Sequence, residues 1–175
     1  MLHFAPEKVI YDKFSSLSNV DYYPVDINPS AKHLAGLKIR DAVDIQHIQY
    51  PDGMFDAVIC SHILEHIPDD LKAMRELRRV LKKGSFAYIM CPIGNFDTTR
   101  ENPEHNTPEL RKEHYGQSDH VRHYGRDFSQ RLTDSGFSVE IIEPNKVLAN
   151  QELHWYGLSR SEIIFKCKEP EAIKD

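Results

Sequence analysis

Residues 44–85 read DIQHIQYPDGMFDAVICSHILEHIPDDLKAMRELRRVLKKGS, and this stretch decides the fold. Its apolar run FDAVIC, at 55–60, is short and follows a turn, which predicts a buried strand. Residues 69–83 then repeat apolar side chains every three or four positions, which predicts a helix that Asp69 caps and Gly84 ends. A strand that leads through a loop into a helix is the unit from which parallel sheets are built.

The same alternation continues on both sides of this stretch and predicts an α/β domain with a mainly parallel sheet. At 175 residues the chain is long enough for one substantial core, so we expect a single domain over residues 1–175. The expected strands are 2–5, one that ends at residue 26, 39–43, 55–60, 85–93, 137–142 and 162–168. Further helices are expected at 7–15 and 126–136.

Composition and charge exclude several classes of protein. Hydrophobic residues make up 40% and charged residues 28%, as in ordinary globular domains, and the net charge of −5 argues against a nucleic-acid partner. No apolar run approaches the roughly 20 residues of a membrane span and no secretory signal begins the chain, so we expect no membrane partner and a cytoplasmic location. A basic cluster at the end of the predicted helix is expected to stay solvated: Arg75, Arg78, Arg79, Lys82 and Lys83.

Two patterns suggest a metal at first sight, and neither predicts one. Cys60, Cys91 and Cys167 lie far apart in the sequence and are expected to be reduced core thiols. The motif H-x-x-E-H at 62–66 is typical of zinc peptidases, but such a site needs a sustained helix and Pro68 follows closely. We therefore expect no metal, and interpret the last histidine of the motif, His66, as a packing or capping residue.

Two acids stand where predicted strands end, as a nucleoside pocket requires. Asp26 ends the second strand 19 residues after Glu7, close to the offset of about 20 at which an acid accepts from ribose hydroxyls. Asp44 ends the third strand, where its carboxylate can accept from the exocyclic amine of a base while the Ile45 N–H donates to the ring. The alternative is that both are loop-edge acids chosen for solubility. Their order along the chain favours a nucleoside site.

The whole of residues 44–85 strongly resembles the class I S-adenosylmethionine-dependent methyltransferases of the methyltransferase type 11 kind. LHFAPE at 2–7 and YGQSDHVRHYGRDFSQRL at 115–132 resemble one bacterial subgroup of that family, so the resemblance covers residues 2–168. It implies a Rossmann-like, three-layer α/β/α fold. The implied sheet has seven strands in the order 3-2-1-4-5-7-6, with the last strand antiparallel.

The resemblance also implies the cofactor, S-adenosyl-L-methionine, and its contacts. The family's first strand ends in an acid and a glycine-rich turn, whereas here His3 stands at the acid's position and Ala5, Pro6 and Glu7 occupy the turn. Glu7 is expected to pair with the cofactor's α-ammonium or sulfonium. The implied cofactor-binding residues are His3, Ala5, Glu7, Asp26, Asp44, Ile45, Ser61 and His62. Similar proteins continue upstream of the first strand, so we expect weak cofactor binding here and self-association into a homo-oligomer.

Residues 95–124 are polar and nearly free of aliphatic side chains, and we expect them to form a lid or insertion on the acceptor side. Within SDHVRHYG at 118–125, His120 is the first candidate for a base that acts on the acceptor and His123 the second. The equally supported alternative is that this motif is a polar network that pins the loop to the domain.

The leading function is methyl transfer from S-adenosylmethionine to a small-molecule or glycan acceptor. A second hypothesis, a non-catalytic binding or assembly module with this fold, follows from the missing glycine turn. A nicotinamide-dependent oxidoreductase is a weak third, because G-x-G-x-x-G follows none of the predicted strands.

Overall fold

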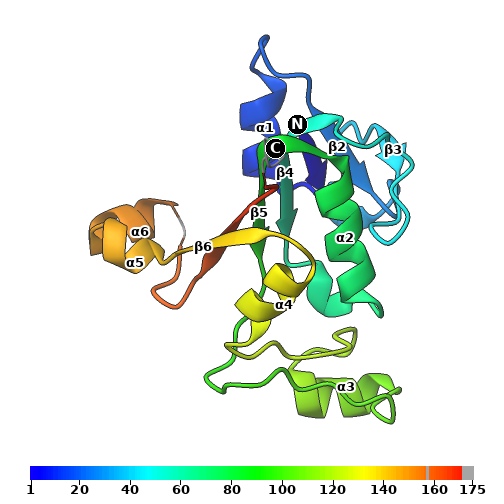
Figure 1. Ribbon diagram of the computed structural model, residues 1–175, viewed down its shortest axis with the longest axis vertical. Helices are drawn as coiled ribbons and strands as arrows, with labels where there is room; N and C mark the ends of the chain where they lie inside the picture. The colour runs from blue at the N-terminus through cyan, green and yellow to red at the C-terminus, as the bar shows by residue number, and fades with distance from the viewer. Residues whose placement is uncertain (157, 171–175) are drawn as a thin grey trace, which may run out of the picture.

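Seven strands form one mixed sheet in the order β3-β2-β1-β4-β5-β7-β6 (Figure 1). The computed structural model describes residues 1–156 and 158–170. β7 is antiparallel to both β5 and β6, and the other neighbouring pairs are parallel, which confirms the expected topology. The strands are β1 Leu2–Phe4, β2 Tyr23–Asp26, β3 Asp41–Ala42, β4 Phe55–Ser61, β5 Leu81–Met90, β6 Ser138–Ile142 and β7 Ile164–Lys168.

Helices lie on both sides of this sheet: α2 and α4 pack together on one side, and α1 lies on the other side of β4 (Figure 1). The helices are α1 Lys8–Ser15, α2 Asp70–Val80, α3 Pro108–Tyr115, α4 Phe128–Asp134, α5 Pro144–Val147 and α6 Asn150–Tyr156, with short 3₁₀ turns η1 Lys32–Leu34 and η2 Leu64–His66. Within the described residues, none of these helices is both long and apolar enough to cross a bilayer.

Helix α2 shows why the central stretch folds as it does. The Asp69 side chain accepts a hydrogen bond from the Lys72 N–H and so caps the helix, as predicted. Met74 and Leu77 are fully buried against the sheet, and burial of side chains of this size contributes roughly 1.5–3 kcal/mol each. The three cysteines are buried and unpaired, which confirms that they belong to the core: Cys60, Cys91 and Cys167.

The predicted end of this helix is wrong by three residues. The helix ends at Val80, and Leu81 adopts an extended conformation, pairs with Phe55 and is buried. Packing of the Leu81 side chain in the core therefore outweighs the helical preference of the lysines that follow. Gly84 does not end the helix but lies in the irregular part of β5 with a positive φ of 78°, and its N–H donates to the Glu169 carbonyl at 3.0 Å.

The polar residues 95–124 contain helix α3, which the sequence analysis did not predict. Thr107 caps it by accepting from the Leu110 N–H at 3.3 Å, Pro108 occupies its first turn, and Gly116 ends it with a positive φ of 87°. These are ordinary start and stop signals. The low content of aliphatic residues had concealed them, because α3 buries only Tyr115.

The end of this polar segment is tied to the loop that follows β4, and Arg122 makes most of the connection. Its side chain is only 5% exposed. One terminal nitrogen donates to the Leu64 carbonyl at 3.1 Å and also to the Ile67 carbonyl, and the other donates to the Pro68 carbonyl at 2.9 Å. In addition, the Val121 N–H donates to the Glu65 carbonyl at 2.9 Å. Within SDHVRHYG, Arg122 therefore makes the contacts expected of a polar network that pins the loop to the domain.

Replacement of Arg122 by lysine is expected to lower the free energy of unfolding by about 3 kcal/mol. Lysine keeps the charge but cannot reach three carbonyls at once, and a bond to a charged donor contributes roughly 1.5–3 kcal/mol. Urea unfolding measures the change. Arg126→Lys is the matched control, because Arg126 is exposed and pairs with the exposed Asp97, so its effect should stay within about 0.5 kcal/mol. Equal effects in the two variants would show that Arg122 does not hold the loop.

Candidate functional site

A cavity of about 410 Å³ lies at the carboxyl ends of the parallel strands. Its wall includes residues from the ends of β1, β2 and β4 and from the loop after β3, so segments far apart in the sequence converge there. Ligands of open α/β sheets bind at this edge. Five of the predicted cofactor-binding residues line it together: Ala5, Asp26, Asp44, Ile45 and His62. The prediction missed Ile27, His33, Ile63, His66 and Asp119, which also line the cavity.

Asp26 is held in place by a hydrogen bond to only one of its two carboxylate oxygens. It is only 7% exposed, and its Oδ1 accepts from the Asn28 N–H at 2.7 Å. Its Oδ2 lies 3.7 Å from Nε2 of His33, whose side chain is mostly exposed. The next residue, Ile27, is 69% exposed although it is apolar, so a flat apolar ligand would find both a carboxylate and an apolar side chain here.

Asp44 offers a second carboxylate on the same wall. Its Oδ1 accepts from the Gln46 N–H at 2.8 Å, and this bond to the backbone is the main reason why the pKa of Asp44 is lowered. The carboxylate is therefore ionised at neutral pH and can accept hydrogen bonds from a ligand. Ile45 is buried beside it and contributes an apolar surface to the cavity.

Two residues of the cavity wall have left-handed backbone conformations without being glycine. Ala5 has a φ of 44° and His62 a φ of 52°, and each comes directly after a strand, β1 or β4. This conformation costs a residue with a Cβ roughly 1 kcal/mol or more. Ala5 thus makes the turn at which the family that the sequence resembles uses glycine, and the chain tolerates the strain at the point where the backbone faces the cavity.

His3, Glu7 and Ser61 are not among the residues that line this cavity, and their contacts with a cofactor remain predictions. His3 is fully buried, and its Nε2 lies 3.0 Å from a Glu7 carboxylate oxygen while its Nδ1 lies 2.8 Å from the Tyr22 hydroxyl. Burial raises the pKa of Tyr22, so this hydroxyl keeps its proton, and the His3 ring bridges it to the Glu7 carboxylate. The predicted acid position is therefore occupied by a histidine that orients a nearby acid.

The carboxylate of Glu7 is held in its ionised form by this arrangement. Burial alone would raise the pKa of Glu7, but hydrogen bonds from His3, from its own backbone and from Ser61 lower it below the ordinary value. Glu7 lies two residues after Ala5, which lines the cavity. The Glu7 side chain is 43% exposed. Its contact with the cofactor's ammonium group remains a prediction.

The two predicted catalytic histidines lie in different surroundings. His120 is 5% exposed and stands behind His66, with the two rings perpendicular and their centroids 4.7 Å apart. It does not line the cavity, but His66 and its neighbour Asp119 do. His123 packs edge-on against Phe96, and burial lowers its pKa, with smaller contributions from His120 and Arg100. The structure thus brings His120, and not His123, next to the cavity wall.

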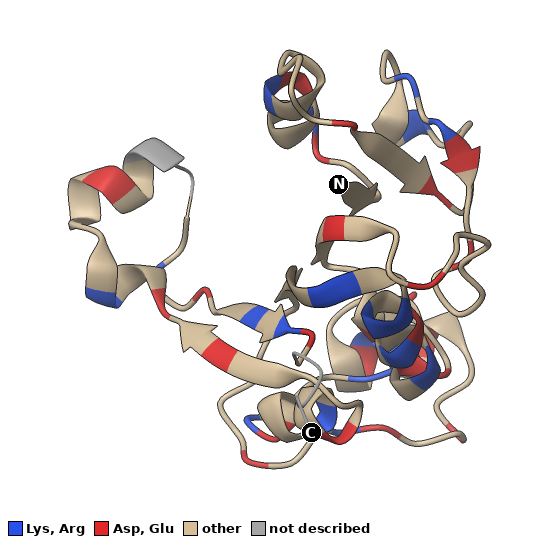
Figure 2. Ribbon diagram, turned by 45° about the horizontal axis from the view of Figure 1, so that its top comes forward, with Lys and Arg blue, Asp and Glu red and all other residues tan. Residues whose placement is uncertain are grey.

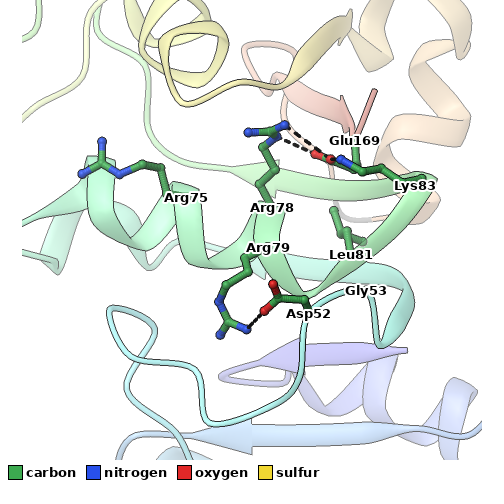
Figure 3. Close-up of a pocket in the computed structure, with 8 residues that line it drawn as sticks. All are labelled: Asp52, Gly53, Arg75, Arg78, Arg79, Leu81, Lys83 and Glu169. Carbon is green, nitrogen blue, oxygen red and sulfur yellow. Dashed lines mark hydrogen bonds and ion pairs between the residues drawn. The ribbon is translucent and has the colours of Figure 1, made fainter. Parts of the chain in front are cut away.

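A second cavity of about 410 Å³ lies at the opposite edge of the sheet, near the end of α2 and the start of β5. Lys and Arg gather on these two elements, with Asp and Glu close by (Figure 2). Arg78 and Lys83 both pair with Glu169, and Arg79 pairs with Asp52 at 2.6 Å, whereas Arg75 points away from these pairs (Figure 3). Acidic partners neutralise most of the basic cluster, which therefore is not simply solvated as predicted.

Replacement of Ala5 by glycine should raise the free energy of unfolding by about 0.5–1 kcal/mol, because glycine adopts the left-handed conformation without strain. Ala35→Gly is the matched control. Ala35 is exposed with an ordinary φ of −56°, so glycine there adds only unfolded-state entropy and should lower stability by roughly 0.5–1 kcal/mol. Chemical denaturation of both variants measures the difference. A loss of stability in both would contradict the assignment of strain to Ala5.

Comparison with known proteins agrees with this architecture. A family model described as a methyltransferase domain matches residues 10–89. The sterol 4-C-methyltransferase strm-1 of Caenorhabditis elegans is 30% identical over 101 residues, which are 55% of this chain and 30% of that protein. The chain spans about a third or less of the length of the curated relatives it matches.

Two solved structures share the fold at low sequence identity. A SAM-dependent methyltransferase from Archaeoglobus fulgidus superposes with a TM-score of 0.62 at 16% identity, over 95% of this chain and 84% of that one. Phosphoethanolamine N-methyltransferase 2 of Haemonchus contortus, solved in complex with S-adenosyl-L-methionine, gives 0.64 at 13% identity, over 98% of this chain and 48% of that one. The chain therefore has a methyltransferase fold, and its residues 10–89 carry the sequence pattern of a methyltransferase domain.

Proposed function

We propose that this chain binds S-adenosylmethionine in the cavity at the carboxyl ends of its parallel strands and transfers the methyl group to an acceptor. The observation that carries the proposal is the convergence of Asp26 and Asp44 on one mainly apolar cavity, beside the strained turn at Ala5. The match of residues 10–89 to a methyltransferase domain supports it.

The nucleoside part would take the wall formed by the two acids. The free oxygen of Asp26 would accept from the ribose hydroxyls, since its other oxygen is already bonded to the Asn28 N–H. Ile27 and Ile45 would enclose the base between apolar side chains. The Asp44 carboxylate would accept from the exocyclic amine, and the Ile45 N–H would donate to the ring.

The methionine part would pass the turn at Ala5, where a small side chain lets the ligand approach the backbone closely. Glu7 would be the acid for its α-ammonium group, and the fixed hydrogen bonds from His3 keep this acid charged and oriented. Hydrogen bonding through His3 would thus replace the acid at the end of the family's first strand.

The chemistry asks mainly for alignment. S-adenosylmethionine supplies a methyl group on a sulfonium, and the protein has to hold the acceptor in line with it and keep water out. His66, Asp119 and the buried His120 lie on the side of the cavity toward the polar segment 95–124. We propose this side for the acceptor, which is a small molecule or a glycan. The roles of His120 and His123 as bases and of the segment as a lid remain predictions.

Asp26→Ala should weaken binding of S-adenosylhomocysteine at least tenfold, because hydrogen bonds to a charged acceptor contribute roughly 1.5–3 kcal/mol each. Isothermal titration calorimetry measures the affinity, with NAD as the comparison ligand. Asp21→Ala is the control, because Asp21 is exposed and precedes β2 at the end of the strand opposite Asp26. The affinity of this variant for S-adenosylhomocysteine should not change. An unchanged affinity in Asp26→Ala would remove Asp26 from the site. Absence of binding by the unaltered chain would favour the non-catalytic module.

A further inference from the structure

Three potential metal ligands converge where the polar segment meets the loop after β4. A carboxylate oxygen of Glu65, a ring nitrogen of His66 and a ring nitrogen of His120 all lie within 4.8 Å of one another. The first two residues stand on the short turn η2, and His120 arrives from a part of the chain more than fifty residues later. The hydrogen bond from the Val121 N–H to the Glu65 carbonyl fixes the two segments in this register.

The carboxylate of Glu65 lacks a partner that its burial requires. The residue is 2% exposed, and its Oε2 has no hydrogen-bond partner in the part of the chain that the structure describes. Its Oε1 lies 3.7 Å from Nδ1 of His62, which is longer than a hydrogen bond. An unpaired buried carboxylate oxygen is costly, and a bound cation is one of the ways in which proteins compensate for it.

The hydrogen bonds of the two histidines leave lone pairs for such a cation. His120 Nδ1 lies 3.3 Å from the Tyr115 carbonyl oxygen, which can only accept, so Nδ1 carries the proton and Nε2 keeps its lone pair. His66 Nδ1 lies 3.3 Å from an Asp119 carboxylate oxygen, which orients this ring in the same way. Metal-ligating histidines commonly donate their other N–H to a carbonyl or a carboxylate in this manner.

We propose that Glu65, His66 and His120 bind one divalent transition-metal ion of the zinc type at the acceptor side of the cavity. Two imidazoles and one carboxylate suit Zn²⁺, Co²⁺ or Fe²⁺ better than Mg²⁺, which prefers oxygen ligands. The ion would require bond lengths of roughly 2.0–2.2 Å to each donor, and the His66 side chain, which is 31% exposed, has room to adjust toward it. Three protein ligands leave at least one position open, and His66 places it toward the cavity.

The proposal revises the interpretation of H-x-x-E-H. The motif does not form the sustained helix of a zinc peptidase, since η2 ends at His66. Its Glu65 and His66 instead combine with His120, which the sequence had suggested as a base. His120 would then act on the acceptor through the metal and not by taking its proton directly.

The role of the ion rests on the proposed methyl transfer and specifies the acceptor as a hydroxyl compound. A metal-bound hydroxyl loses its proton more easily, as metal-bound water does. In the transfer, the acceptor oxygen forms a bond to the methyl carbon and the bond from that carbon to sulfur breaks. Its electron pair stays on sulfur as S-adenosylhomocysteine forms, and the hydroxyl proton leaves to water.

Metal titration of the full chain, stripped with a chelator, tests the site without any methyl acceptor. Calorimetry should find one Zn²⁺ bound with at least about tenfold higher affinity than Mg²⁺, and Co²⁺ should give a visible absorption band of a site with nitrogen ligands. Glu65→Gln and His120→Asn should each weaken Zn²⁺ binding by about 100-fold or more, since even residues behind the ligands contribute 10–100-fold. Zn²⁺ should raise the melting temperature of the unaltered chain and not that of Glu65→Gln.

His105→Asn is the matched control, because His105 and His114 form a stacked pair outside this cluster with centroids 3.8 Å apart. It should leave the tight Zn²⁺ site intact. Retention of tight Zn²⁺ binding in Glu65→Gln and His120→Asn would overturn the proposal, as would an equal loss in His105→Asn or absence of binding by the unaltered chain. Binding of S-adenosylhomocysteine to the metal-free chain is measured in a separate titration. A chain that binds Zn²⁺ but no S-adenosylhomocysteine would contradict the proposed function and not the metal site.

Discussion

The hydrogen bonds from Arg122 to the loop after β4 are the interaction on which the proposed acceptor side of this molecule depends. A guanidinium has five donors in a rigid fork, and here it connects to three backbone carbonyls of the loop after β4. The buried charge is compensated by Glu101 at 2.9 Å and by Asp70 at 3.8 Å, which also accepts from Tyr124 and Arg131. The residues of this network belong to loops and helices that are far apart in the sequence. Their contacts therefore fix the cavity wall in one position.

The proposed cofactor side depends on a different constraint, the geometry of the parallel sheet. Parallel strands bring all their carboxyl ends to one edge, so single residues after β1, β2, β3 and β4 meet there whatever lies between them. The two left-handed residues, Ala5 and His62, stand at this edge in neighbouring strands. Strain of this kind persists only where the surrounding structure enforces it, and functional sites are where it is commonly found.

Sequence reasoning succeeded where a local pattern determines the position of a residue. Asp26, Asp44 and Ile45 line the strand-end cavity because Asp26 ends β2 and the other two lie shortly after β3, and the family resemblance implied the strand order. Their role in cofactor binding stays a prediction. The end of α2 was misplaced because burial of Leu81, a tertiary effect, overrides local helix signals. The His3–Glu7 pair could not be placed from spacing alone, since its geometry depends on Tyr22, the residue before the neighbouring strand β2.

The cluster of Glu65, His66 and His120 is a second feature that local sequence patterns could not predict. H-x-x-E-H and SDHVRHYG lie more than fifty residues apart, and neither motif alone contains the full ligand set. Only the fold shows that the two motifs face each other, because the contact is made across more than fifty residues and is held by side chains that bond to backbone carbonyls. A ligand cluster whose residues come from two distant segments cannot be predicted from the residue spacing within either segment.

A crystal structure of the chain with S-adenosylhomocysteine would test the central claim most directly, namely that a nucleoside cofactor occupies the cavity at the carboxyl ends of the strands. The account predicts density in which the ribose hydroxyls donate to Asp26 and the base lies between Ile27 and Ile45, with its amine at Asp44. Density for the ligand at the opposite edge of the sheet, in the cavity lined by Arg78 and Glu169, or an empty strand-end cavity at saturating ligand, would contradict it.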